Sequence, residues 1–298
     1  MNLLPLRPAA ALLSKKALKH NLKMIREQIR SNTLLHHRDA KMMAIVKADA
    51  YGHDLRMILP ELERHGVRHF AVASLEEGVQ ARALSKSATI LILGGTLHFS
   101  RETLSFLKRN RFHMAVSDLE ALKFFLKHPE IPIHLKLDTG MNRLGLRPEL
   151  WQTAIQLLKK SDRKLDGLFT HYATTQDAIF HSQARLFEEA VRWFWAEGFR
   201  PPFVHSENSA ALFGKQSLSK GLLSEVGNFV RTGISMYGYY PRGLSGTRLT
   251  PVLELVSEVG LVKPVKVGEG ISYGHLYRAK KSHSYGIVTL GYADGLSK

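Results

Sequence analysis

Short apolar runs alternate with amphipathic helical stretches along most of the chain. After Ser14, the apolar residues Leu18, Leu22, Ile25 and Ile29 recur at helical spacing, while lysines occupy the other faces. This pattern predicts an amphipathic helix with Ser14 as its N-cap. Beyond it, an apolar run, a turn and an amphipathic stretch repeat about every 25 residues, as in successive β/α units.

The apolar runs are expected to be buried parallel strands, because they are nearly continuous and are separated by helical stretches. Two of them lead into capping boxes, Ser74-x-x-Glu77 and Ser117-x-x-Glu120, which indicates that each strand passes directly into a helix. Eight such units fit an α/β fold of the closed (β/α)8, TIM-type barrel better than an open sheet, and place the chemistry at the carboxyl ends of the strands. The runs are Met42–Ala48, His69–Ser74, Thr89–Gly94, Phe112–Ser117, Ile133–Asp138, Leu165–His171, Phe203–Ser206 and Phe229–Met236.

A second pattern begins after Arg242. Gly243, Ser245 and Gly246 are expected to form a linker, followed by antiparallel strands without helices between them. We therefore expect a barrel domain in residues 1–242 and the start of a mostly β domain in residues 243–298, whose few strands leave open edges and little core. The expected strands of this domain are Val252–Val262, Lys263–Val267 and Tyr285–Leu290.

The composition narrows the classes of partner. With 298 residues, 44% of them hydrophobic, the chain has the composition of an ordinary globular protein. Its formal charge of +16 is spread over scattered basic pairs, typical of solvated helix faces, so we expect no nucleic-acid partner; a basic binding patch is the alternative. No apolar run approaches a membrane span. The absence of cysteine excludes disulfides and makes the cytoplasm the simplest location.

Polar residues gather at the expected carboxyl ends of the strands. One of them, Lys47, closes the apolar run Met42–Val46, so it would be partly desolvated, which makes it a candidate nucleophile for a Schiff base. A snorkelling surface lysine is the alternative interpretation. The full set comprises Lys47, Lys136, Arg143, His171, His205, Asn208, Ser209 and Arg231.

The segment around Lys47 resembles a known motif. Ala44-Ile-Val-Lys-Ala-Asp-Ala-Tyr-Gly-His53 is similar to the cofactor-lysine motif of alanine racemases, which are fold-type III pyridoxal-phosphate enzymes. The resemblance continues in order along nearly the whole chain. It runs through Lys136-Leu-Asp-Thr-Gly-Met-Asn-Arg-Leu-Gly145, His171-Tyr-Ala-Thr, His205-Ser-Glu-Asn-Ser-Ala210, Arg231-Thr-Gly-Ile-Ser-Met-Tyr-Gly238, Ile271-Ser-Tyr-Gly274 and Gly291-Tyr-Ala-Asp-Gly295.

This resemblance implies an isomerase that interconverts L-alanine and D-alanine and supplies D-alanine for peptidoglycan. Lys47 would bind pyridoxal 5'-phosphate and act as one acid/base group, and Tyr273 would be the second, on the opposite face of the substrate. In the family this tyrosine comes from the partner subunit, so the resemblance implies a homodimer with shared active sites. A core-packed aromatic is the alternative for Tyr273.

The resemblance also implies roles for the remaining residues. Arg231 would face the pyridine nitrogen of the cofactor, where a guanidinium discourages protonation of the ring; a structural salt bridge is the alternative. Arg143 would contact the substrate carboxylate, supported by Lys136, which some relatives carry as a carbamate. The other expected cofactor-binding residues are Tyr51, His171, Asn208, Ser209, Gly233 and Ile234.

Several features limit these expectations. His53 and His205 are interpreted as structural, no metal site is expected, and the pair Gly94-Gly95 is too weak to indicate a phosphate loop. The resemblance implies that the family's β domain, with a methionine loop and a further tyrosine, continues beyond Lys298. A pyridoxal-phosphate homeostasis protein without a β domain, and a racemase of broader specificity, remain alternatives.

Overall fold

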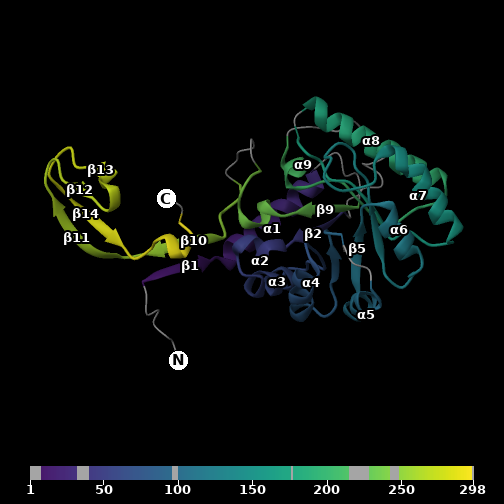
Figure 1. Ribbon diagram of the computed structural model, residues 1–298, viewed down its shortest axis with the longest axis horizontal. Helices are drawn as coiled ribbons and strands as arrows, with labels where there is room; N and C mark the ends of the chain where they lie inside the picture. Colours follow the sequence, from purple (N-terminus) through teal and green to yellow (C-terminus); the bar gives the residue numbers. More distant parts are fainter. Residues whose placement is uncertain are drawn as a thin grey trace. The chain divides into compact units, whose positions relative to one another are not determined.

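The computed structural model divides the chain into two compact units (Figure 1). It describes residues 8–31, 40–95, 100–175, 177–214, 228–241 and 248–296. One unit comprises Lys15–Val252, and the other combines the N-terminal segment up to Ser14 with Leu253–Lys298. The expected linker residues Gly243, Ser245 and Gly246 lie outside the described residues.

The larger unit is a nearly closed parallel barrel, as predicted. In its described part, eight strands are hydrogen-bonded in the order β8-β7-β6-β5-β4-β3-β2-β9, and each lies within or overlaps one of the predicted runs. The strands are β2 (Lys41–Ile45), β3 (His69–Val72), β4 (Thr89–Ile92), β5 (Phe112–Val116), β6 (Ile133–Lys136), β7 (Gly167–Phe169), β8 (Phe203–His205) and β9 (Phe229–Thr232).

The seam between β8 and β9 completes the barrel through a few polar contacts. The Val204 N–H donates to the side-chain oxygen of Asn228 (3.0 Å), and the Asn228 N–H donates to the Val204 carbonyl (3.0 Å). Further along, the Arg231 N–H donates to the Glu207 carbonyl (3.0 Å), and Asn208 forms a parallel bridge with Arg231. Arg231 is thereby fixed at the seam by its own backbone.

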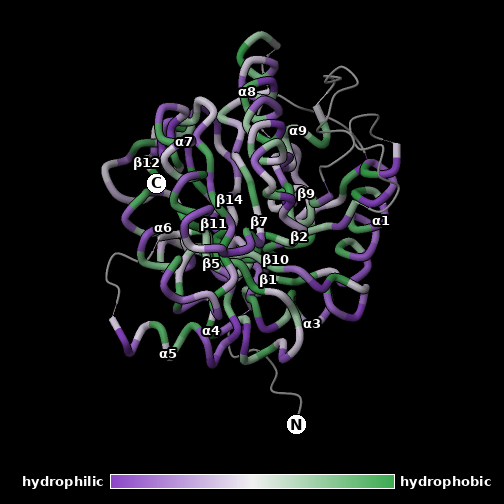
Figure 2. Tube along the Cα trace, turned by 90° about the vertical axis from the view of Figure 1, so that its right-hand side faces the viewer, coloured by the Kyte–Doolittle hydropathy of each residue, from purple (hydrophilic) through white to green (hydrophobic). Residues whose placement is uncertain are grey.

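Helices surround the strands. In α1, the four apolar residues predicted from the spacing are all buried, which confirms the amphipathic helix. Along α1 and α8 the colour alternates between hydrophilic and hydrophobic, as expected for helices with one buried face (Figure 2). The helices are α1 (Lys15–Ser31), α3 (Leu55–Arg64), α4 (Leu75–Leu84), α5 (Arg101–Asn110), α6 (Leu119–Leu126), α7 (Pro148–Lys160), α8 (Asp177–Ala196) and α9 (Ser209–Phe213). None of the described helices is long and apolar enough to cross a membrane.

The two predicted capping boxes have different outcomes. Ser74 is the N-cap of α4, and its hydroxyl accepts from the Glu77 N–H (3.3 Å). The prediction for Ser117 was wrong, because the N-cap of α6 is Asp118, whose carboxylate accepts from the Ala121 N–H (2.8 Å). The helix therefore begins one residue later than the box requires, although β5 (Phe112–Val116) ends directly before Ser117.

The smaller unit is built from antiparallel pairs. β1 (Ala9–Leu13) pairs with β10 (Leu253–Ser257), so the N-terminal segment, which the sequence pattern assigned to the barrel, belongs with the β unit. The predicted strand Val252–Val262 is divided at Glu258, and Lys263–Val267 is not a separate strand, because β11 (Val259–Val265) continues into it and ends at Val265. β11 pairs with β14 (His283–Val288), and β12 (Gly270–Ile271) pairs with β13 (Tyr277–Arg278).

A left-handed turn follows β2. In α2 (Lys47–Gly52), the four residues from Ala48 to Tyr51 have φ between 51° and 56°, a region that costs L-residues about 1–2 kcal/mol each. Hydrogen bonds hold the turn in place. The Ala48 N–H donates to Glu77 Oε1 (2.7 Å), and the Leu55 N–H donates to Asp49 Oδ1 (2.8 Å). Glu77 also accepts from the Ala73 N–H (2.7 Å), so it ties the ends of β2 and β3 together.

We expect substitutions at the exposed Ala48 to report on this turn. Ala48→Val should lower the free energy of unfolding by about 1 kcal/mol, because a β-branched residue tolerates positive φ poorly. Ala48→Gly should change it by less than about 0.5 kcal/mol, since relief of strain is offset by a more flexible unfolded chain. Urea unfolding of the two variants measures the difference; equal stabilities would contradict the left-handed geometry.

Candidate active site

A cavity of about 430 Å³ opens at the carboxyl ends of the barrel strands. It brings together nearly every candidate site residue that the sequence placed in the barrel. These residues are Lys47, Tyr51, Lys136, Arg143, His171, Asn208, Ser209, Arg231, Gly233 and Ile234. The apolar part of the lining, which includes Ile45, Leu93, Leu144 and Phe169, was not predicted, because apolar residues at strand ends are indistinguishable from core. Gly94, set aside as a weak signal, also lines the cavity.

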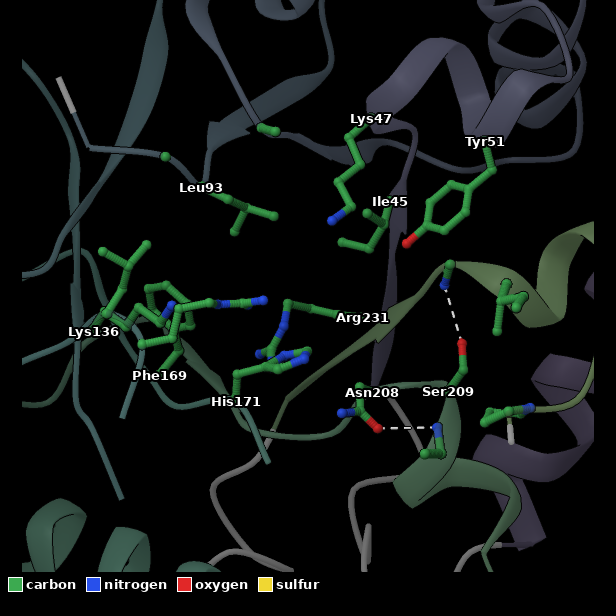
Figure 3. Close-up of a pocket in the computed structure, with 18 residues that line it drawn as sticks. Ile45, Lys47, Tyr51, Leu93, Lys136, Phe169, His171, Asn208, Ser209 and Arg231 are labelled. Carbon is green, nitrogen blue, oxygen red and sulfur yellow. Dashed lines mark hydrogen bonds between the residues drawn. The ribbon is translucent and has the colours of Figure 1, made fainter. Parts of the chain in front are cut away.

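The left-handed turn delivers two side chains to this cavity. Lys47 and Tyr51, four positions apart, both point into it, with the amine and the hydroxyl directed toward its centre (Figure 3). Burial raises the pKa of the Tyr51 hydroxyl, so this group is a hydrogen-bond donor at neutral pH. His53, on the same turn, is buried and stacks on Tyr237 (4.4 Å between ring centres).

Hydrogen-bonding groups gather around Gly233. The Gly233 N–H donates to Ser209 Oγ (3.1 Å), and a Cβ atom built on Gly233 would lie 2.7 Å from Tyr51 Oη. Only glycine therefore allows the tyrosine hydroxyl to approach this backbone. The two hydroxyls and the neighbouring amides form a group that is suited to an anion.

Arg231 is the central charge of the site. The residue is only 3% exposed, and Nη1 donates to Nδ1 (2.6 Å) and the carbonyl (3.0 Å) of His205. Nη2 donates to the carbonyls of Thr170 (2.6 Å) and Ser206 (2.9 Å) and lies 3.3 Å from His171 Nδ1. Burial lowers the pKa of Arg231 to about 10, so it remains charged at neutral pH. In the described part of the chain, no carboxylate forms an ion pair with it, so a salt bridge does not account for it.

Neighbouring groups respond to this charge. Burial, followed by the charge of Arg231, lowers the pKa of His171 to about 3, so its ring is neutral. Burial raises the pKa of the Glu207 carboxyl to about 7, although Arg231 opposes the shift. Glu207 is an acid that was not predicted as a site residue, and its backbone rather than its side chain contacts Arg231.

A second basic pair occupies another wall of the cavity. Burial, with the charges of Arg143 and Arg231, lowers the pKa of Lys136 to about 8. Its amine lies 5.9 Å from the centre of the Phe169 ring. Lys136 is thus a buried amine with a substantial neutral fraction at neutral to mildly basic pH.

Two other candidates have different surroundings. Asn208 lines the cavity, but its side-chain oxygen accepts from the N–H groups of Ala210 and Ala211 (both 3.0 Å), so it caps α9. Tyr273 belongs to the β unit, on the short helix η2 (Tyr273–His275), and is 94% exposed, which excludes a core-packed role within this chain. In the described part of the chain, no cluster of metal-binding side chains was found.

The fold and the cavity define an α/β-barrel enzyme with a mostly β second unit. Two family models match this chain. The alanine racemase N-terminal domain matches residues 13–241, and the alanine racemase C-terminal domain matches residues 252–298. The alanine racemase of Limosilactobacillus fermentum is 34% identical over 97% of this chain and 76% of its own length. That of Geobacter sp. is 32% identical over the same shares.

Solved structures agree. The alanine racemase of Clostridium difficile 630 superposes with a TM-score of 0.83 at 30% identity, covering 99% of this chain and 76% of the other. A Bartonella henselae alanine racemase with covalently bound pyridoxal phosphate shares the fold (TM-score 0.78, 23% identity, 97% and 77% coverage). The chain belongs to the alanine racemase family, enzymes of the isomerase class that act on amino acids. The match to the C-terminal family domain argues against the homeostasis proteins, which lack that domain.

The contact between Gly233 and Tyr51 generates a prediction. Gly233→Ala should destabilise the protein by about 1–3 kcal/mol, because the new Cβ overpacks against the tyrosine hydroxyl. Adding Tyr51→Phe should recover part of this loss, since the hydroxyl is the nearest atom. Thermal unfolding of the two single variants and the double variant measures the coupling; strictly additive effects would show that the two residues do not touch.

Proposed function

We propose that this protein is a pyridoxal-phosphate-dependent alanine racemase, which interconverts L-alanine and D-alanine and supplies D-alanine for peptidoglycan. The observation that carries the proposal is a single cavity in which the Lys47 amine faces a buried guanidinium that no described carboxylate pairs with. The covalently bound pyridoxal phosphate of the Bartonella relative supports the choice of cofactor.

The residues present fit this cofactor. Its phosphate would be held by the hydroxyls of Tyr51 and Ser209 and by the amides of Gly233 and Ile234, the anion-suited group described above. Lys47 would form the covalent bond, and His171 and Asn208 would line the ring. When bound, the cofactor supplies an electron sink that makes the Cα proton of an attached amino acid removable.

Arg231 would limit how strongly the cofactor withdraws electrons. A guanidinium offers donors and no acceptor, so it opposes protonation of a basic nitrogen that accepts its hydrogen bond. Arg231 remains charged, and no carboxylate among the described residues forms an ion pair with it, so its positive field reaches the cavity. A shallow sink favours simple exchange of the Cα proton over reactions such as transamination.

Inversion at Cα requires acid/base groups on two opposite faces. Lys47 Nζ would hold or release the proton on one face, and Tyr273 Oη on the other. Tyr273 is exposed on the β unit, so it is available to complete the cavity of a second copy, and we propose a homodimer with two shared sites. Arg143 would orient the substrate carboxylate by paired hydrogen bonds, with Lys136, as a carbamate, holding it in position.

The assignment of Lys47 is tested by covalent trapping. Purified protein is incubated with pyridoxal phosphate, reduced with borohydride and mapped by mass spectrometry. We expect the adduct on Lys47 in the parent and in the control Lys41→Ala, at the exposed start of β2. Lys47→Ala should lose the adduct and at least about a thousandfold of the rate of D-alanine formation. An adduct that persists in Lys47→Ala would refute the assignment.

The shared active site is tested by mixing two inactive variants, Lys47→Ala and Tyr273→Phe. After subunit exchange, a mixed dimer has one site with both changes and one intact site. Since half of the dimers are mixed, about a quarter of the parent activity should return. Sites completed within one chain would recover nothing, because every chain then carries a defect; the same variants mixed without exchange are the control.

A further inference from the structure

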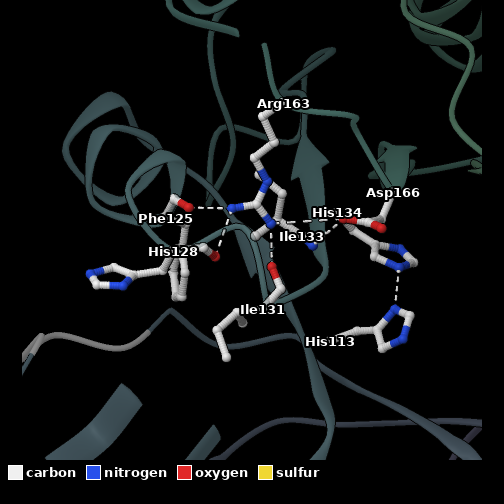
Figure 4. A network of polar contacts seen from close by, with 8 residues as sticks. All are labelled: His113, Phe125, His128, Ile131, Ile133, His134, Arg163 and Asp166. Carbon is white, nitrogen blue, oxygen red and sulfur yellow. Dashed lines mark hydrogen bonds and ion pairs between the residues drawn. The ribbon is translucent and has the colours of Figure 1, made fainter. Parts of the chain in front are cut away.

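Three histidines lie in a line through the barrel interior and end at Arg231. His113 Nδ1 is 3.1 Å from His134 Nε2, and His134 Nδ1 is 3.0 Å from His205 Nε2. His205 Nδ1 is in turn 2.6 Å from Arg231 Nη1. The first contact is visible in Figure 4, and the residues come from β5, β6, β8 and β9. His134 and His205 are completely buried.

A glycine on β7 leaves space for the row of three histidines. β7 lies between β6 and β8, and its residue Gly167 pairs with His134 on one side and Phe203 on the other. A Cβ atom on Gly167 would overlap the imidazole ring of His134. The absence of a side chain there lets the His134 ring lie across β7 and reach His205. Phe203 packs against His134 and His113, with ring centres 4.9 Å and 5.7 Å away.

The arginine fixes the direction of every hydrogen bond in the line. A guanidinium only donates, so His205 Nδ1 accepts and its proton is on Nε2. That Nε2–H donates to His134 Nδ1, which places the His134 proton on Nε2 as well. The same step fixes His113 with Nδ1 as acceptor and Nε2 protonated.

All three rings are neutral. Burial, followed by neighbouring groups that include Arg231, holds the pKa values of His134 and His205 well below the usual range. Burial and the charge of Arg82 lower the pKa of His113 to about 4. The acceptor nitrogen of each ring faces toward Arg231, so the negative ends of three dipoles point at the guanidinium.

We infer that His113, His134 and His205 form a one-directional hydrogen-bond chain that solvates and orients Arg231 without adding a negative charge beside it. A carboxylate in the place of His205 would also stabilise the guanidinium, but it would cancel the field that Arg231 exerts on the cavity. Neutral dipoles stabilise the cation and retain that field. His134 and His113 are therefore positioning residues; their effect on the reaction rests on the proposed function, whereas the chain itself does not.

The chain is tested first by NMR on cofactor-free protein labelled with ¹⁵N-histidine at neutral pH. Long-range ¹H–¹⁵N correlations distinguish protonated from unprotonated ring nitrogens, and single-histidine variants assign the signals. We expect His113, His134 and His205 each to carry one proton, on Nε2. A proton on Nδ1 of His134 or His205, or a doubly protonated ring at either position, would overturn the inference.

Variants of His134 then separate positioning from packing. His134→Phe removes the acceptor for the His205 Nε2–H, while Arg231 still keeps the proton on Nε2. The downfield-shifted signature of a hydrogen-bonded Nε2–H should therefore be lost from His205, and kcat of the loaded enzyme should fall about tenfold. His134→Asn restores an oxygen acceptor near the place of Nδ1 and should return the His205 signature and most of kcat. His128→Phe, outside the line, is the matched control and should change neither.

Two further outcomes are decisive. If His134→Phe does not fold, Gly167→Ala takes its place, because its Cβ displaces the His134 ring without removing a histidine. A variant with the line broken that keeps both the His205 signature and the parent kcat would overturn the inference. A parent protein without racemase activity but with the three expected tautomers would refute the proposed function and leave the chain intact.

Discussion

A full positive charge buried in the wall of the barrel is the constraint on which the rest of the site depends. Removing a guanidinium from water is unfavourable unless its donors are satisfied, and Arg231 meets this condition with two backbone carbonyls, a third from His205 and an imidazole nitrogen. Those carbonyls come from the ends of β7 and β8, and its own backbone closes the seam with the segment after β8. The same residue therefore closes the barrel through its backbone and places the positive charge through its side chain.

The opposite wall of the cavity is positioned by a different device. Lys47 and Tyr51 reach the same space because the intervening backbone turns left-handed, and Glu77 holds that turn through two amides on neighbouring strand ends. Hydrogen bonds from Glu77 of α4, outside the turn, thus offset the backbone strain of the left-handed residues. Hydrogen bonds thus position the side chains on both walls of the cavity, which suits an enzyme that must hold proton-transferring groups at fixed positions on a small substrate.

Much of this was predictable from the sequence where the information is local. Apolar runs located all eight barrel strands, and short motifs located ten of the residues that line the cavity, because each depends on a few adjacent positions. The cap of α6 was misplaced by one residue because Ser117 and Asp118 are adjacent and both are good N-caps, so the local sequence does not distinguish them. The pairing of β1 with β10 joins opposite ends of the chain, so no local sequence pattern indicates it.

The row of three histidines was also not predicted. His134 and His205 are 71 positions apart, and His205 alone resembles a buried structural histidine.

The space above Gly167 has a consequence for how this barrel can diverge. A larger residue at 167 collides with the ring on the adjacent strand, and a smaller residue at 134 leaves an opening beside a glycine that cannot fill it. Neither position can drift alone without either a steric clash or a void in the interior. Positions 134 and 167 are therefore expected to change together. A homologue can carry a larger residue at 167 only if a smaller side chain replaces the histidine at 134.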